Sequence, residues 1–418
     1  MRNIIVMATM DTKGVESAYL AERILRIGTS LQIDVIVVDV GIRGEAIGIT
    51  PDIDRYAVAE AGGHTMDEVR SQVRGDALAM MCDGAKQVVK NLYAQGRCDG
   101  IVSLCGGSGG SVVMEAMEVL PVGIPKIMTT PLASGSRPFE FYVKSKDIMI
   151  MHSVIDIIGV NSVSRVIYDN LADAIVGAVA FRDTSNAHDR KTERKAVSVT
   201  MLGNTTDGIT VMKSDLEKKG YEVACFHSSG VGGRAMEAMV EDGYFDAVID
   251  YTTNEIFEDI IGGLQKGCGP KRMTVAGRLG VPQVIVPGCC DVFDQGPIET
   301  VPPEIANKRK LYKHSPAFTL CKLTHEEMIQ VAEIFAEKLN ASTGPVAVVI
   351  PLKGFSIPGC PGGIFEDFEG VRLFADRLKF LLSPTITYKE VDAHINDENF
   401  AHTVADVFFT LMQDDNAQ

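Results

Sequence analysis

The chain has 418 residues, 46% of them hydrophobic, a formal net charge of −15 and no tryptophan. We expect two domains, because a single hydrophobic core rarely grows beyond roughly 250–300 residues. The negative charge argues against general affinity for nucleic acid or for an anionic membrane surface, so neither is expected as a partner.

Two features of the sequence predict a cytoplasmic protein. The nine cysteines are scattered without a C-x-x-C pair, which argues against a disulfide framework and for a reducing compartment. The apolar run 4–10 ends at Asp11 and is too short for a signal peptide, so it predicts the first strand instead. No run approaches the roughly 20 apolar residues of a membrane-spanning helix.

Strand and helix patterns alternate along the first half of the chain. Short apolar runs predict strands at 4–8, 34–38, 99–105, 125–128 and 148–151. Helical patterns are found at 14–27, 70–95 and 112–120. A further helix is expected after Asn161, a residue type that caps helix N-termini. Strands that are apolar throughout are typical of parallel sheets, because helices cover both of their faces.

The alternation restarts after a polar stretch at 182–195. We therefore place a linker at 184–195, between an N-terminal nucleotide-binding domain at 1–183 and a C-terminal domain at 196–418. The second half has predicted strands at 197–202, 222–226, 247–250, 283–286 and 346–350, and predicted helices at 209–219, 235–240 and 400–412. Repeated alternation predicts the α/β fold class, with two doubly wound, Rossmann-like parallel-sheet domains.

The most informative stretch is rich in glycine and joins the strand at 99–105 to the helix at 112–120. It consists of Gly106, Gly107, Ser108, Gly109, Gly110 and Ser111. The backbone N–H groups of such a turn, and the N-terminus of the helix that follows, attract phosphate. The stretch lacks both the G-x-G-x-x-G spacing and the Gly-Lys of a P-loop, so a tight strand–helix junction is the alternative interpretation.

Loops after neighbouring strands are expected to complete one nucleotide site, because ligands of open α/β sheets bind at the carboxyl ends of the strands. Asp11 is the candidate Mg²⁺ ligand and Lys13 a candidate phosphate partner, with Asp11 or Thr12 as a simple helix cap as the alternative. Asp39 ends the second strand, where a ribose-binding carboxylate can lie. The other candidates of this site are Thr129, Ser134 and Gly135.

The second half contains a similar stretch after the strand at 222–226. Its candidates for binding a second anion are Ser229, Gly230, Gly232, Gly233 and Arg234. His227 precedes them and is a candidate proton donor or acceptor. Asp250 and Glu255 follow the next strand as a candidate acid–base pair or as cation ligands, and Thr253 as a helix cap is the alternative.

Several stretches together resemble one known family. They are Asp11–Lys13, Gly106–Gly110, Ala133–Gly135, Ser153–Asn161, His227–Glu237, Asp250–Thr253 and Arg309–Pro316. The resemblance covers nearly the whole chain and is to a bacterial, fungal and plant family that includes the ATP-binding N-terminal domain of the tomato mosaic virus resistance protein. The chain departs from the family pattern at Ser111 and at Ser228-Ser229, and Ser111 and Ser229 keep the hydroxyl group.

The resemblance implies ATP and Mg²⁺ as cofactors of the N-terminal domain and association into a homodimer or a larger homo-oligomer. It also implies a separate partner protein with a barrel that resembles phosphoenolpyruvate-utilising enzymes. One functional hypothesis is an ATP-dependent enzyme that acts on a small organic acid or sugar acid, an anionic substrate held at an inter-domain cleft. The other is a non-catalytic nucleotide-binding regulatory or interaction protein. An NAD-type oxidoreductase is disfavoured, because the G-x-G-x-x-G spacing is missing.

Overall fold

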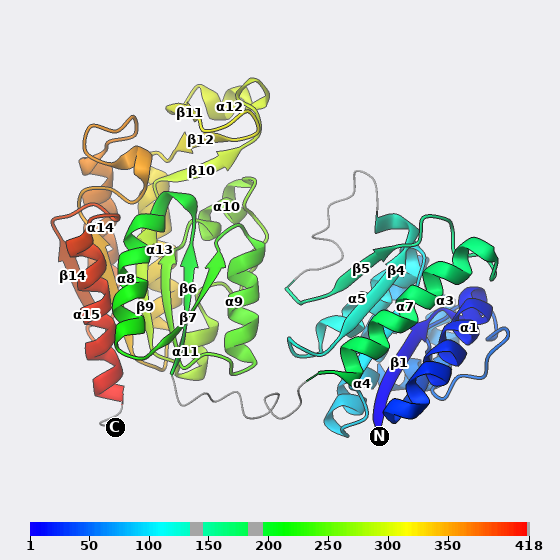
Figure 1. Ribbon diagram of the computed structural model, residues 1–418. Helices are drawn as coiled ribbons and strands as arrows, with labels where there is room; N and C mark the ends of the chain where they lie inside the picture. Colours follow the sequence, from blue (N-terminus) through cyan, green and yellow to red (C-terminus); the bar gives the residue numbers. More distant parts are fainter. Residues whose placement is uncertain (134–144, 183–194, 416–418) are drawn as a thin grey trace. The chain divides into compact units, whose positions relative to one another are not determined.

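The computed structural model describes residues 1–133, 145–182 and 195–415 (Figure 1). The chain divides into two compact units, Met1–His188 and Asp189–Gln418, here called the first and the second unit. Each unit has its own hydrophobic cores. The linker expected at 184–195 lies outside the described residues, except for Lys195.

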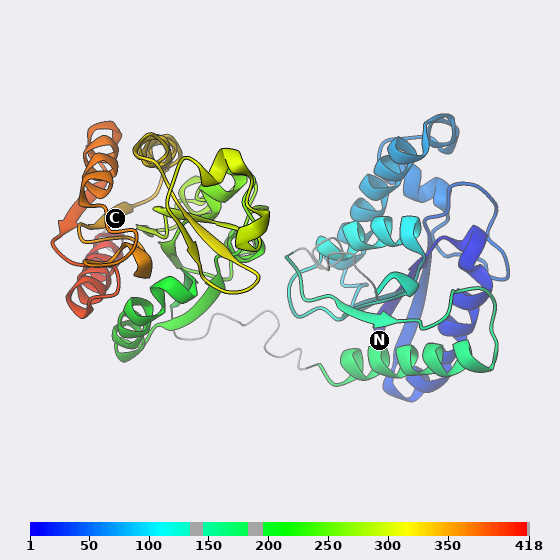
Figure 2. The ribbon, with the colours of Figure 1, turned by 90° about the horizontal axis from the view of Figure 1, so that it is seen from above.

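The first unit is a five-stranded sheet, all parallel, with helices on both faces (Figure 2). Its strands, in the sheet order β2-β1-β3-β4-β5, are β2 (Ile33–Asp39), β1 (Arg2–Ala8), β3 (Gly100–Leu104), β4 (Lys126–Thr130) and β5 (Met149–His152). One face is covered by α1 (Met10–Gly28) and α7 (Ser162–Ala180). The other face is covered by α2 (Arg55–Ala61), α3 (Met66–Ser71), α4 (Arg74–Ala94) and α5 (Gly107–Glu118).

The second unit has a six-stranded parallel sheet in the order β14-β13-β9-β8-β6-β7. Its strands are β6 (Ala196–Met201), β7 (Glu222–His227), β8 (Ala247–Thr252), β9 (Gln283–Gly288), β13 (Val346–Pro351) and β14 (Thr387–Val391). Helices α8 (Thr206–Lys218) and α15 (Glu398–Asp415) pack on one face. On the other face lie α13 (His325–Asn340) and α14 (Phe368–Leu381), and shorter helices are α9 (Val231–Glu241), α10 (Glu255–Ile261), α11 (Val275–Leu279) and α12 (Pro303–Ala306).

A small antiparallel sheet of the second unit was not predicted. It consists of β10 (Val292–Gln295), β12 (Thr319–Lys322) and β11 (Leu311–Lys313), in the order β10-β12-β11. Its strands are only three or four residues long, too short for a clear period in the sequence. Figure 1 places this sheet beyond the end of the parallel sheet at which β6 finishes.

Both units are doubly wound, and the second repeats the strand order of the first with β14 added at one edge, which confirms the predicted fold class. In each unit the chain winds first to one side and then to the other, so the direction reverses between β1 and β3 and between β6 and β8. Ligands of such sheets bind at this reversal, outside the carboxyl ends of the strands. The fold therefore provides one candidate position in each unit.

Two helices begin earlier than the sequence indicated. Helix α1 begins at Met10 and α5 at Gly107, after the extended residues Thr9 and Gly106. Most of the residues expected in loops therefore lie in the first helical turn. Gly107 and Gly109 thus belong to a helix and not to a loop. Their N–H groups still lack a partner within the helix, because they lie in its first turn. Asn161 caps α7 as expected, with its side chain accepting from the N–H groups of Val163 and Ser164.

The C-terminal helix and the search for membrane-spanning helices complete the description of the fold. Helix α15, predicted from 400–412, packs on the body of its own unit through Phe400, Val404 and Phe408. Across the described ranges, no helix combines the length and the apolar character that crossing a membrane requires.

Helix α4 packs so closely on α2 that a glycine is required between them. A Cβ atom on Gly84 would lie 2.0 Å from the Val58 carbonyl oxygen. We expect Gly84→Ala to lower the free energy of unfolding of the first unit by about 1–3 kcal/mol, because backbone must shift. Hydrogen–deuterium exchange of first-unit peptides in increasing urea measures this change. Gly177→Ala in α7 is the matched control, since open space surrounds that position. Because alanine favours the helix more than glycine does, this substitution should raise the free energy of unfolding by up to about 1 kcal/mol. Equal effects of the two substitutions would contradict the packing argument.

Candidate functional site

The carboxyl ends of β1, β2 and β3 surround a cavity of about 560 Å³, here called the first-unit cavity. It lies at the reversal of the strand order, between β1 and β3. Of the predicted nucleotide-binding residues, this cavity brings together Asp11, Thr12, Lys13, Gly106, Gly107 and Gly109. Its apolar lining is Val40, Ile42, Val69, Ala77 and Leu78.

Helix α5 directs unbonded N–H groups to this edge of the sheet. The N–H groups of Gly107, Ser108 and Gly109 have no acceptor among the residues that the structure describes. The first turn of α1 is more fully satisfied, because Met10 N–H is bonded to Asp39, and Thr12 and Lys13 N–H to the Thr9 carbonyl oxygen. The N-terminus of α5 therefore has the greater capacity for an anion.

The two helix starts lie against each other. A Cβ on Gly109 would be 3.0 Å from Cγ2 of Thr9, so this position admits no larger side chain without a shift. By contrast, no heavy atom lies within 4 Å of a Cβ built on Gly106. One glycine thus serves packing, while the other leaves open space beside the cavity.

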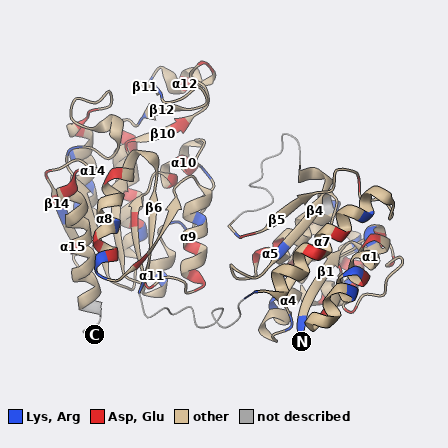
Figure 3. Cartoon of the chain, viewed as in Figure 1, with Lys and Arg blue, Asp and Glu red and all other residues tan. Residues whose placement is uncertain are grey.

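Four cationic side chains line the first-unit cavity, against one carboxylate: Lys13, Arg43, Arg70 and Arg74 against Asp11. Oδ2 of Asp11 accepts hydrogen bonds from the N–H groups of Arg43 and Gly44, each at 3.1 Å. Elsewhere acidic and basic residues alternate along the helices of both units (Figure 3). An excess of positive charge in a chain of net charge −15 favours an anionic ligand at this cavity.

The cations differ in how they are held. The Lys13 ammonium donates to the carbonyl oxygen of Ile157. Arg70 donates from Nε to the Ile42 carbonyl oxygen at 3.3 Å and lies over the ring of Tyr56. Within the described part of the chain, the exposed guanidinium of Arg43 makes no hydrogen bond or ion pair. Arg43 is therefore free to meet a ligand without breaking an internal contact.

Other predicted residues of this site lie away from the cavity. Asp39 is buried, and its Oδ1 accepts from the N–H groups of Met10 at 2.9 Å and Gly41 at 2.8 Å. Burial raises its pKa against the effect of these hydrogen bonds. Asp39 thus ties β2 to the start of α1 instead of facing the cavity. Thr129 is buried in β4, Gly110 and Ser111 continue α5, and Ser134 and Gly135 lie outside the described residues.

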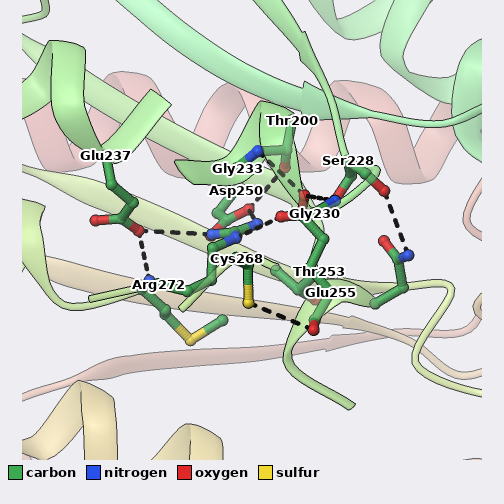
Figure 4. A network of polar contacts seen from close by, with 12 residues as sticks. Thr200, Ser228, Gly230, Gly233, Glu237, Asp250, Thr253, Glu255, Cys268 and Arg272 are labelled. Carbon is green, nitrogen blue, oxygen red and sulfur yellow. Dashed lines mark hydrogen bonds and ion pairs between the residues drawn. The ribbon is translucent and has the colours of Figure 1, made fainter. Parts of the chain in front are cut away.

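The glycine-rich stretch of the second unit is already filled by a carboxylate of the chain (Figure 4). Oε1 of Glu255 accepts from the N–H groups of Gly230 at 2.5 Å and Gly233 at 3.1 Å. A Cβ on Gly233 would lie 1.8 Å from Oε2 of the same carboxylate, and one on Gly232 would lie 1.8 Å from the His227 carbonyl oxygen. These glycines therefore make room for Glu255 and the neighbouring backbone, where a second anion was expected.

Arg272 lies at the centre of a buried ion network, which Figure 4 shows. Its side chain is 0% exposed; Nε donates to Glu255 at 2.7 Å, and Nη2 to Asp250 at 2.7 Å. Burial alone would lower the pKa of Arg272, but the carboxylates of Asp250 and Glu255 raise it well above its usual value. Glu237 lies 3.6 Å from Nη1, and burial raises its pKa to about 7.

The expected catalytic residues are thus separated by the structure. Asp250 and Glu255 belong to the buried ion network, while His227 lines a different pocket. Ser229 and Arg234 lie beside Gly230–Gly233, and Nε and Nη2 of Arg234 are buried without a hydrogen-bond partner in the part of the chain that the structure describes. The hydroxyl of Thr253 donates to the Val286 carbonyl oxygen at 3.0 Å, so it caps no helix.

A second pocket, of about 220 Å³, lies at the carboxyl ends of the strands around the β6/β8 reversal, and the small antiparallel sheet contributes to its lining; we call it the second-unit pocket. Besides His227, it is lined by Asn254, Glu258, Asp294 and His314, which the sequence analysis missed. No motif marks them, because they come from separate elements. The one sequence signal for Asn254 and Glu258 is that they follow the parallel strand β8, at the edge of the sheet where ligands bind.

Among the residues that the structure describes, Arg272 is the cation paired with the carboxylates of the buried ion network, so we expect it to stabilise the second unit. Arg272→Met leaves the three carboxylates of Glu237, Asp250 and Glu255 without their partner and should lower the free energy of unfolding by about 3–5 kcal/mol. The neighbouring Lys271→Ala removes only an exposed ion pair with Glu241 and should cost less than about 1 kcal/mol. Urea denaturation, followed by hydrogen–deuterium exchange of second-unit peptides, compares the two. Similar losses in both variants would refute a central function of Arg272.

Glu258 should make the stability of the second unit depend on pH. Burial, followed by the neighbouring charge of Asp294, raises the pKa of Glu258 from 4.5 to about 8. The folded state therefore holds a proton that the unfolded state releases, so this contribution to stability is complete below about pH 4.5 and is lost as the pH rises through about 8. Relative to Glu258→Gln, the wild type should lose up to about 1.4 kcal/mol per pH unit in this window. Urea denaturation of both proteins at about one-unit steps between about pH 5 and 8 measures the difference between their free energies of unfolding. A difference that stays constant with pH would contradict the raised pKa of Glu258.

Comparisons with known proteins agree with the motifs. A UPF0261 protein of Clostridium tetani is 39% identical over 99% of this chain and 99% of its own length. The tomato (Solanum lycopersicum) protein ToMV resistance protein Tm-1(GCR237) is 32% identical over 98% of this chain, which spans 55% of the tomato protein. The match to a solved structure, the UDP-GlcNAc 2-epimerase of Methanocaldococcus jannaschii in complex with UDP-GlcNAc and UDP, covers 98% of this chain and 92% of that chain, with 8% identity and a TM-score of only 0.21.

Family models give the same result for both units. The N-terminal domain of the uncharacterised protein family UPF0261 matches residues 2–184, and its C-terminal domain matches residues 194–412. The relatives include the tomato protein, so the family that the motifs indicated is confirmed. The chain belongs to the UPF0261 family.

Proposed function

We propose that the first unit binds a nucleoside triphosphate, ATP, in the first-unit cavity. The observation that carries the proposal is that three N–H groups of α5 without an acceptor in the described ranges meet four cationic side chains at the β1/β3 reversal. Phosphate is the ligand group that such an arrangement favours, because the helix N-terminus adds a partial positive charge to the donors.

The phosphates would lie against Gly107–Gly109, with Lys13 and Arg43 beside them. Arg43 offers a planar group that can hold phosphate oxygens in pairs. Lys13 would act as a point charge, since its ammonium keeps one hydrogen bond to Ile157 and has further donors. Gly106 leaves the approach open, because nothing lies within 4 Å of a Cβ at that position.

The base would occupy the apolar part of the first-unit cavity, formed by Val69, Ala77, Leu78 and their neighbours. The volume of about 560 Å³ falls in the range of roughly 300–1,000 Å³ typical of small-molecule pockets. Apolar lining on one side and cations on the other match the two ends of a nucleotide.

Asp11 fits a Mg²⁺ ion that arrives with the phosphates. Its Oδ2 is bonded to two N–H groups, while Oδ1 accepts no hydrogen bond from the residues described. Mg²⁺ is commonly held by one or two carboxylates together with phosphate oxygens and water. The bound ion would neutralise phosphate charge. No cluster of three or more His, Cys, Asp or Glu in the described ranges offers an all-protein metal site.

Nucleotide binding by a regulatory or interaction protein is better supported than ATP-dependent chemistry on an organic acid. The second-unit stretch expected to hold the acid is occupied by Glu255. Our proposal for the first unit therefore concerns binding.

Arg43→Ala should weaken the binding of Mg-ATP at least about tenfold, which corresponds to about 1.4 kcal/mol, because an unpaired guanidinium at the cavity is lost. Isothermal titration calorimetry on the full chain measures the affinity. Arg97→Ala is the matched control, since Arg97 is exposed and precedes β3, at the opposite edge of the sheet. The proposal fails if the wild type binds no Mg-ATP, or if both variants bind it equally well.

A further inference from the structure

We propose that the second-unit pocket is an acid–base site for a small uncharged hydroxy-carbonyl compound, with Glu258 and Asp294 transferring protons and Asn254 positioning the ligand. The site belongs to the second unit and does not depend on nucleotide binding. Its place at the β6/β8 reversal is the position at which a doubly wound sheet binds its ligand.

Asn254 provides an unsatisfied acceptor in this pocket. Its side chain is 2% exposed, and Nδ2 donates to Oε1 of Gln265 at 2.5 Å and to the Ser228 carbonyl oxygen at 3.3 Å. Because both partners are acceptors, the orientation of the amide group is fixed. Oδ1 then has no donor among the residues described, although buried polar atoms are nearly always bonded. This oxygen has almost no solvent-exposed surface, so a ligand hydroxyl group would supply the missing donor once the side chains that cover the oxygen move aside.

Glu258 and Asp294 form the reactive pair. Oε1 of Glu258 accepts from the Asp294 N–H at 2.7 Å, which holds the two residues together. Gln265 bridges them, since its backbone N–H donates to Glu258 at 3.3 Å and its side chain donates to Asp294. The backbone at Gly263 packs directly against the Glu258 carboxyl group, because a Cβ on Gly263 would lie 1.7 Å from Oε2 of Glu258.

The surroundings give the two carboxyl groups different protonation states. Burial raises the pKa of Glu258 to about 8, and the charges of Asp294 and Glu255 act in the same direction. Burial raises the pKa of Asp294 to about 6, while His314 and the Gln265 side chain oppose the rise. Near neutral pH one group of the pair therefore carries a proton and the other is ionised, as acid–base chemistry requires.

The lining of the pocket selects an uncharged ligand. No Lys or Arg is among its described lining residues, and the two histidines, His227 and His314, are exposed. A carboxylate or phosphate would thus meet two carboxyl groups and no fixed cation. The apolar part of the lining is Leu202, Val292, Phe293, Phe318 and Leu320. The volume of about 220 Å³ suits a compound no larger than a monosaccharide.

The proton transfer balances without a cofactor. The Asp294 carboxylate takes the proton from the carbon next to the carbonyl group, and the electron pair of that C–H bond forms a C=C bond. The π pair of the carbonyl group moves to its oxygen, which takes the proton of Glu258. The resulting enediol returns to a hydroxy-carbonyl compound when the protons move back. In heavy water the carbon atom receives deuterium.

The test uses the full chain with hydroxyacetone, dihydroxyacetone and D-xylose as probes, and proton NMR follows the loss of the C–H signal in heavy water. Wild-type protein should accelerate exchange for at least one probe. Asp294→Asn and Glu258→Gln should lower the rate at least about a hundredfold, the usual contribution of a general acid or base. Glu241→Gln, on the exposed side of α9, is the matched control and should keep the wild-type rate.

Asn254→Ala separates positioning from proton transfer. Because Asn254 holds the ligand, this variant should raise the half-saturating probe concentration at least about tenfold, or about 1.4 kcal/mol, and change the saturated rate far less. Circular dichroism confirms that each variant is folded. The proposal is overturned if the wild type exchanges none of the probes, if Asp294→Asn exchanges as fast as Glu241→Gln, or if gluconate binds more tightly than the neutral probes.

Discussion

All strands of a parallel sheet end at one edge, and this constraint determines where both units can bind anything. Each helix that follows a strand begins at that edge, so the unbonded N–H groups of its first turn gather there. Such groups must find an acceptor in the chain, in water or in a ligand. The two units meet this requirement differently. In the first unit the N–H groups of α5 have no described acceptor, whereas in the second unit Glu255 bonds to those at the start of α9.

The buried ion network of the second unit follows from the use of Glu255 as the acceptor for the N–H groups at the start of α9. A carboxylate placed under Gly230 and Gly233 lies deep in the unit, where an isolated charge is expensive to keep. Arg272 offsets this charge and also holds Asp250, so a single cation links the end of β8 to the start of α10. Buried ion pairs add little net stability compared with apolar packing, but the loss of one partner is costly. The network therefore constrains the geometry beneath the second-unit pocket.

Local sequence pattern predicted most strands of the two parallel sheets and the loops beside the first-unit cavity, but it predicted neither the small antiparallel sheet nor the arginines that line this cavity. The strands read as valine- and isoleucine-rich runs because they are buried on both faces, and the residues after β1 and β3 meet because the strands are adjacent. Edge strand β14 escaped notice because it is polar and partly exposed. Glu258, Asp294 and Arg272 could not be foreseen, since their partners lie in other elements. The bonds from Glu255 to Gly230 and Gly233 span 25 and 22 residues, beyond any local motif.

The filled stretch at Gly230–Gly233 has a consequence for how genomes are annotated. A scan that scores glycine spacing after a strand would count two anion sites in this chain, although one of them already contains an acid of the protein itself. The feature that distinguishes a filled stretch from an open one is a downstream glutamate paired with a buried arginine, here Glu255 with Arg272. Relatives that keep this pair would be scored as having an internal substitute for a ligand, and relatives that lose it would be the ones in which a true second anion site is worth seeking.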